Sequence, residues 1–238
     1  MPKPKGKPAP VVVPAKSAPA AVPFTFDPLT FEVHAGNVTL VMLDVTTTLH
    51  RIHQDIYSAS QFNPGKGNAR FSPINDFKGN AIPTIYAGET FECAAMESVF
   101  HDVSCQPGLK AYNKAKLSGQ VHSTVVTKQA LALADLRTKA LRKLGIPRNV
   151  LIDTEKSQYT FTRTVAEAIH AKCHDIQGLQ WTSRQDDDAS AYMLFGDRID
   201  AKALQHAGDS KSLSGDTVTY EAVLNLAEQI GVEIVLFK

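Results

Sequence analysis

The stretch from residue 68 to residue 102 combines two side-chain types that could act together on one ligand. Glu97 has the apolar neighbours Met96 and Val99, and an ionisable group beside buried surface is costly unless it is paired or used. Arg70 precedes it in a turn-rich segment and adds a cation to the same stretch. We therefore treat this stretch as the candidate site and the rest of the chain as its scaffold.

Each candidate residue taken alone also has an ordinary structural explanation. A helix acid such as Glu97 is usually exposed or ion-paired. Ser183, in the sequence TSRQ, is by default a turn or strand-end hydroxyl and is not part of a GxSxG elbow. Arg163 lies near the start of an expected helix, where an arginine is more often a surface residue, although it could also reach the site. The glycine-rich residues 64–68 predict an ordinary loop, with anion binding the less favoured interpretation.

The elements that must position these residues follow from periodicity and turn signals. Strands are expected at residues 38–43, 49–53, 83–86, 121–127, 178–183, 189–195 and 232–237. Helices are expected at residues 91–102, 131–144, 159–174 and 216–231, with a polar surface excursion at 109–119. Short strands mixed with helices, without a regular βαβ rhythm, indicate an α+β fold.

Two of these elements would orient candidate side chains directly. Alternation along residues 49–53 places Arg51 on one face of a strand. With Thr90 as N-cap, the helix at 91–102 carries Glu97 and His101 close to one stripe, together with Ala94 and Ser98. For the helix at 159–174, Thr162 or Thr164 is the expected starting cap.

Length and charge limit the class of protein. A chain of 238 residues suits one compact domain, or one domain with appendages. The formal net charge of +1 provides no basic field, so no direct nucleic-acid partner is expected. The Pro-, Lys- and Ala-rich residues 1–23 predict a disordered arm, and residues 24–238 the folded domain.

Cysteine, histidine and apolar patterns exclude further classes. The sequence has three cysteines without CxxC spacing, which favours a cytoplasmic protein over a disulfide-bonded one. No apolar run has the roughly 18–20 residues that a membrane helix needs. The eight histidines form no HExxH motif and no Cys/His quartet, so no metal site is predicted.

The combination of candidates is more specific than any member. The order of Arg51 or Arg70, then Tyr86, Glu97 and Ser183, resembles the RES-domain family, named for its Arg, Glu and Ser. The likeness spans roughly residues 48–198, in the segments LHRIH, GNARFSPI, IPTIYAGETFECAAMESVFHD, YTFTRTVAEAIH, GLQWTSRQ and YMLFGDR. Arg51 and Arg70 both stand in family-like contexts, so either could be the family's arginine.

The resemblance implies a function and a fold. It implies a single domain similar to ADP-ribosyltransferases, with mostly antiparallel strands and peripheral helices. It implies NAD+ as substrate, cleaved at the nicotinamide–ribose bond by hydrolysis or by phosphorolysis with inorganic phosphate, and no metal. Members are often bacterial toxins, so a neutralising antitoxin or immunity protein is an expected partner, and delivery into a target cell's cytoplasm is an alternative setting. Two other functions stay open: ADP-ribosyl transfer to a protein, and a catalytically silent nucleotide-binding module.

The resemblance also implies roles for individual residues, and each role is chemically reasonable. Glu97, Arg70 and Ser183 are the expected catalytic residues, and Arg51, Arg70, Tyr86 and Ser183 the expected contacts to NAD+. A carboxylate stabilises the positive charge that develops on the ribose, and arginine forks suit a pyrophosphate. An aromatic face suits nicotinamide, and a serine hydroxyl can bond its carboxamide or the ribose.

Overall fold

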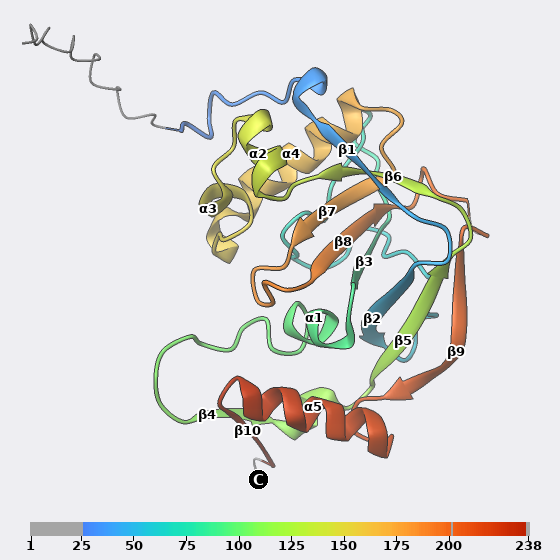
Figure 1. The fold of residues 1–238 in the computed structure, drawn as a ribbon, viewed down its shortest axis with the longest axis vertical. Coiled ribbons are helices and arrows are strands. Elements are labelled where there is room, and N and C mark those ends of the chain that lie inside the picture. Colours follow the sequence, from blue (N-terminus) through green and yellow to red (C-terminus); the bar gives the residue numbers. More distant parts are fainter. Residues whose placement is uncertain (1–25, 201, 237–238) are drawn as a thin grey trace, which may run out of the picture.

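A computed structural model describes residues 26–200 and 202–236 of the chain. The predicted arm, residues 1–23, lies outside the described residues. Within them, one large sheet has the strand order β1-β6-β7-β8-β3-β2-β5-β9, and a small sheet pairs β10 with β4 (Figure 1). The strands are β1 (Thr39–Leu43), β2 (Thr48–Gln54), β3 (Thr84–Gly88), β4 (Lys110–Asn113), β5 (Gln120–Thr127), β6 (Leu131–Asp135), β7 (Gly178–Thr182), β8 (Ser190–Phe195), β9 (Leu204–Ser212) and β10 (Val232–Val235).

The helices lie around this sheet. They are α1 (Phe91–Met96), α2 (Thr138–Leu144), α3 (Arg148–Leu151), α4 (Tyr159–Lys172) and α5 (Thr217–Gln229), with 3-10 turns at Ala35–Asn37, Lys114–Leu117 and Lys156–Gln158. Figure 1 shows α2, α3 and α4 gathered on one side, and α5 at the opposite end of the molecule. The large sheet is antiparallel except for β6 and β7, which pair in parallel. The predicted α+β class with a mostly antiparallel sheet is confirmed.

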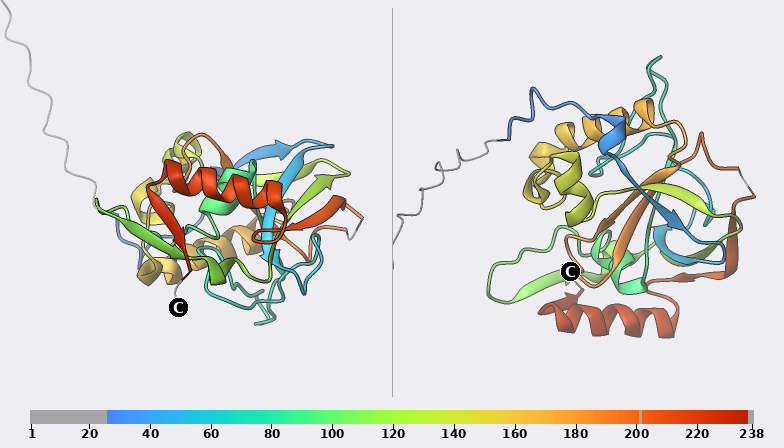
Figure 2. Two further views of the ribbon diagram at one scale, coloured as in Figure 1. Left: turned by 90° about the horizontal axis from the view of Figure 1, so that it is seen from below. Right: turned by 45° about the horizontal axis from the view of Figure 1, so that its top comes forward.

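Three buried clusters hold the layers together. The first cluster includes Leu141 of α2, Ile169 of α4 and Trp181 of β7. A second lies between strands around Leu49 and Leu194. The third joins α1 to α5, β10 and the segment that contains β4, and both views in Figure 2 show α5 alongside β10 and β4. The candidate helix α1 therefore lies between the large sheet and this C-terminal layer.

The single helix predicted at residues 131–144 is wrong in its first part. Residues 131–135 form β6, an interior strand between β1 and β7, and the helix α2 begins only at Thr138. Leu131 and Leu133 are fully buried at a spacing of two, which is a strand period rather than a helix period. The Asp135 carboxylate accepts from the Arg137 backbone N–H at 2.9 Å and marks the turn between the two elements.

The helix predicted at residues 91–102 is shorter than expected. Thr90 caps it as predicted, accepting from the Cys93 N–H, but α1 ends at Met96 and Glu97 is its C-cap. After Glu97 the ladder changes, because Ser98 N–H donates to Ala95 and the Ser98 hydroxyl donates to the Ala94 carbonyl. Serine side chains that bond a preceding carbonyl compete with the helical ladder.

Three further elements differ from the sequence predictions. The helix α4 begins at Tyr159 rather than at Thr162 or Thr164, and the Thr162 hydroxyl instead donates to the Arg70 and Tyr159 carbonyls. The strand β9 has no counterpart among the predictions, because its polar sequence LQHAGDSKS has no apolar alternation. The excursion at 109–119 is anchored: β4 pairs with β10, and Leu117 is fully buried.

Candidate active site

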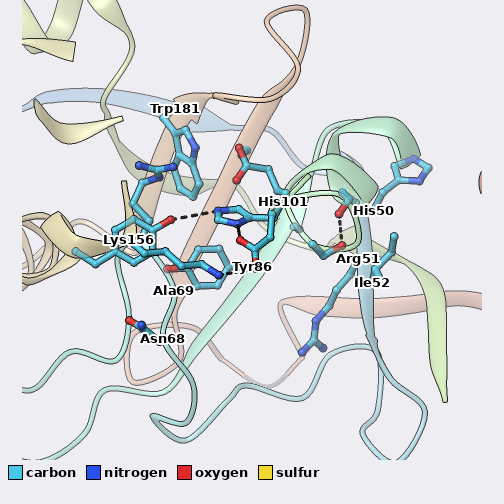
Figure 3. A pocket seen from close by; sticks show the side chains of 17 residues that line it. His50, Arg51, Ile52, Asn68, Ala69, Tyr86, His101, Lys156 and Trp181 are labelled. Atoms are coloured by element: carbon cyan, nitrogen blue, oxygen red, sulfur yellow. Dashed lines mark hydrogen bonds and ion pairs between the residues drawn. The ribbon is translucent and has the colours of Figure 1, made fainter. Parts of the chain in front are cut away.

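A cavity of about 270 Å³ collects most of the predicted site residues (Figure 3). Arg51 from β2, Arg70 from the loop before β3, Tyr86 from β3 and Glu97 from the end of α1 all line it. Ser183 is fully buried and lies outside the lining. The structure therefore brings the acid, both arginines and the tyrosine together, and places the serine behind them.

The position of Glu97 is set by a close approach between β3 and α1. A Cβ on Gly88, the last residue of β3, would lie 2.6 Å from the Ala94 backbone nitrogen, so only glycine lets the helix pack this closely. Glu97 Oε1 then accepts from the Ser183 hydroxyl at 2.7 Å and from the Arg184 N–H at 3.2 Å. Two donors on one oxygen fix the carboxylate beside the cavity.

Ser183 acts on Glu97 rather than on the cavity itself. Its hydroxyl oxygen accepts from the Gln185 and Asp186 N–H groups at 3.0 and 3.1 Å, while its proton goes to Glu97. The sequence predicted a direct contact from Ser183 to the substrate; in the structure its hydroxyl bonds Glu97, and the residue does not line the cavity.

Arg70 is a buried cation with unused donors. Its side chain is only 4% exposed, and Nη1 donates to the Thr154 hydroxyl at 2.9 Å and the Thr154 carbonyl at 3.3 Å. The guanidinium lies over the Tyr159 ring, 5.3 Å from its centroid. Burial lowers the pKa of Arg70, while Tyr159 and Glu97 oppose that shift.

Unpartnered donors concentrate in this cavity wall. Among the described residues, the buried side-chain nitrogen and oxygen atoms without a hydrogen-bond partner are Arg70 Nε, Arg70 Nη2 and Trp181 Nε1, and both residues line the cavity. Buried donors are normally satisfied, since an unmet one costs roughly 1–3 kcal/mol. The wall is therefore suited to a ligand that supplies anionic or carbonyl oxygens.

Arg51 is held differently from Arg70. Its Nη1 donates to the Ser58 and Ala59 carbonyls at 3.1 and 2.6 Å, and burial lowers its pKa to about 10. Of the two arginines, Arg70 is the one with buried donors that lack a partner, and it lines the cavity together with Glu97.

Tyr86 provides a fixed aromatic wall. Its hydroxyl oxygen accepts from the Phe71 N–H at 3.0 Å, and its ring meets Trp181 edge to face at 6.2 Å between centroids. Burial raises the pKa of Tyr86, so the phenol is neutral. The residue lines the cavity, and its hydroxyl is already bonded by the backbone.

A chain of polar side chains that also lines the cavity was not predicted as part of the site. His101 Nδ1 is 2.7 Å from Asp102 Oδ1, and His101 Nε2 is 3.1 Å from the Tyr159 hydroxyl. Lys156 Nζ donates to Asp102 Oδ2 at 2.6 Å, and this bond, followed by that from His101, lowers the pKa of Asp102. His101 was expected on the Glu97 stripe, whereas nothing in the sequence brought Lys156 and Tyr159 to this wall.

Arg163 does not line the cavity. Its guanidinium donates to the Ala69 carbonyl at 3.1 and 3.2 Å and to the Asn68 side chain. Because Asn68 and Ala69 both line the cavity, Arg163 supports the loop that presents Arg70.

The described residues offer neither a metal site nor a membrane-spanning helix. No group of three or more His, Cys, Asp or Glu side chains in residues 26–200 and 202–236 could hold a metal ion. In the same part of the chain, no helix has the length and apolar character to cross a membrane.

The cavity thus combines a fixed carboxylate, a buried guanidinium with free donors and aromatic walls, and the sequence around it matches a known family. The RES-domain family model matches residues 48–216. The chain belongs to the RES-domain family. This RES domain covers the large sheet from β2 to β9 and the whole cavity, and it ends just before α5. The resemblance seen in the sequence is confirmed.

Comparison with solved structures supports the fold. One chain of the crystal structure of the M. tuberculosis MbcT–MbcA toxin–antitoxin complex is similar with a TM-score of 0.53. The two chains share 15% sequence identity, and the match covers 76% of this chain and 90% of that chain. At this identity the likeness concerns the fold alone. A search of curated proteins gave no significant match.

Proposed function

We propose that this RES-domain protein cleaves the nicotinamide–ribose bond of NAD+ and acts as a toxin by depleting it. The observation that carries the proposal is the pairing of Glu97, fixed by two hydrogen bonds, with the unpartnered donors of Arg70 in one cavity. NAD+ offers both matching parts, a sugar carbon that becomes cationic and a pyrophosphate that is anionic.

The reaction needs little from the protein beyond placement and charge. The bond between ribose C1′ and the nicotinamide nitrogen breaks, and its electron pair leaves with the nicotinamide, which becomes neutral. Positive charge develops on the ribose, as in glycoside cleavage. The Glu97 carboxylate stabilises that charge from a fixed position, so little reorganisation is required during the reaction. An oxygen of water or inorganic phosphate then bonds to C1′, and with water a proton is released.

The remaining wall residues hold the substrate. Arg70 Nε and Nη2 donate to a phosphate oxygen, which satisfies both groups in the complex. Tyr86 supplies a fixed ring face for the nicotinamide. Ser183 keeps Glu97 in the reactive orientation.

The test is release of free nicotinamide from NAD+ by the purified protein, with and without inorganic phosphate. We expect turnover by the wild type and its loss in Glu97→Ala and Glu97→Gln. Glu92→Gln, an exposed acid on the same helix, is the matched control and is expected to retain turnover. No release by the wild type, or equal release by the Glu97 variants, would contradict the proposal. Dependence on phosphate separates phosphorolysis from hydrolysis.

The toxin role and a neutralising protein partner belong to the same proposal. They are supported by the RES-domain family and by the similar fold of a chain from a toxin–antitoxin complex. In a lysate with labelled NAD+, a covalent mark on a protein would instead assign the chain to ADP-ribosyl transfer.

A further inference from the structure

Hydrolysis at the ribose carbon C1′ releases a proton that Glu97 is poorly placed to take. A water molecule that bonds to C1′ through its oxygen must lose one proton. The negative charge of Glu97 is what stabilises the ribose, so protonating this carboxylate would remove the stabilisation. Its Oε1 also already accepts from Ser183 and Arg184. The proton therefore needs another acceptor in the cavity wall.

His101 and Tyr159 form a hydrogen-bonded pair in that wall. Both line the cavity with Glu97, and the Tyr159 hydroxyl oxygen lies 3.1 Å from His101 Nε2. His101 is in the turn after α1, where Gln185 Nε2 donates to its backbone carbonyl at 3.1 Å. Tyr159 is the first residue of α4, and its ring lies under the Arg70 guanidinium. Burial raises the pKa of Tyr159, so the hydroxyl is protonated and passes a proton on only as it takes one up.

Asp102 determines which nitrogen of His101 is free to take a proton. Lys156 Nζ donates to Asp102 Oδ2 at 2.6 Å and, ahead of His101, lowers the pKa of this carboxyl, which is therefore ionised. Asp102 Oδ1 lies 2.7 Å from His101 Nδ1, and a carboxylate only accepts, so Nδ1 carries the ring proton. In the neutral ring, Nε2 then accepts from the Tyr159 hydroxyl. A carboxylate that orients an imidazole in this way prepares it to act as a base.

We propose that Tyr159 and His101 relay the proton of the attacking water and so serve hydrolysis specifically. As the water oxygen bonds to C1′, one water proton passes to the Tyr159 oxygen and the Tyr159 proton passes to His101 Nε2. The electron pair of the broken bond leaves with nicotinamide, and the ribose keeps the hydroxyl. The imidazolium lies against Asp102, whose side chain is 71% exposed, so its extra proton passes to solvent. This inference rests on the proposed function and names the residues that make water an acceptor.

Phosphate does not need this relay. Inorganic phosphate carries anionic oxygens, so one of them bonds to C1′ without first losing a proton. The relay therefore affects formation of ADP-ribose, the product of hydrolysis, and not formation of the ADP-ribose that carries phosphate at C1′. The ratio of two products formed in one solution depends on which acceptor bonds to the ribose, and not on how fast nicotinamide leaves. This ratio separates a proton relay from a general loss of activity.

The test measures this product ratio with purified protein and NAD+ in a solution that contains phosphate or, as a second anionic acceptor, azide. We expect His101→Gln to lower the ratio of ADP-ribose to the anion product at least about tenfold, since a general base contributes on the order of 10²–10⁴ in rate. Tyr159→Phe, which keeps the ring beside Arg70 and removes only the hydroxyl, is expected to cause the same change. The matched controls are the exposed His174→Gln and the buried Tyr192→Phe, which do not line the cavity and are expected to keep the wild-type ratio.

The possible results distinguish the relay from the proposed function. Continued formation of the anion product by His101→Gln and Tyr159→Phe shows that both variants are folded and still release nicotinamide. An unchanged ratio in either variant, or an equal loss of both products, overturns the relay and leaves the proposed function intact. Formation of the phosphate product alone by the wild type, without ADP-ribose, also overturns only the relay. No nicotinamide release by the wild type, with or without phosphate, overturns the proposed function and the relay with it.

Discussion

The Ser183 hydroxyl has three hydrogen-bond partners. Its oxygen accepts from the N–H groups of Gln185 and Asp186, which fixes the turn after β7. Its proton is donated to Glu97. A serine can make all three bonds because one oxygen accepts twice while it donates once. Ser183 thus joins the turn after β7 to the acid at the end of α1.

Replacing Ser183 by alanine tests the bond to Glu97. We expect Ser183→Ala to slow nicotinamide release about 10- to 100-fold, because a hydrogen bond to a charged acceptor contributes roughly 1.5–3 kcal/mol. The KM for NAD+ is expected to change little, since the hydroxyl does not line the cavity. Steady-state kinetics of the variant beside Ser118→Ala, an exposed serine, provide the measurement. A large rise in KM with an unchanged kcat would instead mean that Ser183 contacts substrate.

Arg70 is expected to lower the stability of the free protein. Its buried guanidinium leaves Nε and Nη2 unsatisfied, so an apolar side chain of similar length removes a cost to the free protein. The Thr154 carbonyl keeps a donor, Arg184 Nη1 at 2.7 Å. We expect Arg70→Met to abolish nicotinamide release while Tm stays equal or rises. Thermal denaturation of Arg70→Met is the measurement, with Arg142→Met at an exposed arginine as the control. A Tm lowered by more than about 5 °C in Arg70→Met would show that the guanidinium mainly stabilises the fold.

The element that carries Glu97 depends on a layer outside the matched family domain. The helix α1 contributes Ala95 and Met96 to the third cluster, where α5 contributes Val223 and Leu226. The family match ends at residue 216, before α5 begins. This C-terminal layer therefore buries the back of the helix whose end positions the acid.

Two leucines on α5 test the contribution of that layer. Leu226 is 6% exposed and Leu224 is 38% exposed. We expect Leu226→Ala to lower the free energy of unfolding by about 2–5 kcal/mol, the usual cost of truncating a buried leucine, and to lower nicotinamide release by loosening α1. Leu224→Ala is the control on the same helix and is expected to cost less than about 1 kcal/mol. Urea denaturation of both variants gives the comparison, and equal losses would contradict this account of α5.

Histidines on neighbouring strands make the stability depend on pH. His122 of β5 and His50 of β2 lie with their rings stacked, and His122 Nε2 is 3.0 Å from His50 Nδ1. Burial, followed by repulsion from His50 and His53, lowers the pKa of His122 from 6.5 to about 4. The unfolded chain therefore binds a proton in this window and the native chain does not. The His122 contribution to stability is complete above pH 6.5 and is lost as the pH falls toward about 4.

Removing His122 should flatten this dependence. We expect the free energy of unfolding of the wild type to decrease as the pH falls from 6.5 to about 4. The shift in the pKa of His122 sets an upper limit of about 3 kcal/mol on its share of this decrease. The actual share is smaller, because the ring is only half-buried and solvent screens its charge. His122→Asn is expected to show a smaller decrease over the same range, whereas exposed His34→Asn keeps the wild-type slope. Denaturant curves at several pH values provide the measurement, and parallel slopes for wild type and His122→Asn would rule out this origin.

Sequence patterns predicted elements best where burial is periodic. The strand β5 follows a clear alternation and the helix α4 a helical spacing, and both lie close to their expected positions. Residues 131–135 were misassigned because LALAD fits a helix as well as a strand, and only pairing with β1 and β7 decides. The edge strand β9 gave no signal, since most of its side chains are exposed and polar.

At the scale of the whole molecule, the site joins two distant parts of the chain. Arg70, Tyr86 and Glu97 come from the first part, and Thr154, Tyr159 and the turn at Ser183 from the second. Local sequence patterns could indicate candidate residues within each part, and the resemblance to the family showed that the two parts belong to one site. Neither could show that Ser183 bonds Glu97 or that the Arg70 guanidinium lies over the Tyr159 ring, because both contacts join residues far apart in the sequence and depend on the folded arrangement.

The proposed activity has a consequence for a whole cell. Induced expression of the wild type in a bacterium is expected to stop growth, with the cellular NAD+ concentration falling before growth slows. Glu97→Gln, which keeps the shape of the side chain but loses its charge, is expected to leave both unchanged, and Glu92→Gln is expected to behave as the wild type. Measured NAD+ and optical density over time provide the comparison. Growth arrest by Glu97→Gln, or arrest without a fall in NAD+, would mean that toxicity arises from binding rather than from cleavage. A neutralising protein is expected to restore both growth and NAD+, since covering the cavity that Arg51 and Glu97 line would block substrate entry.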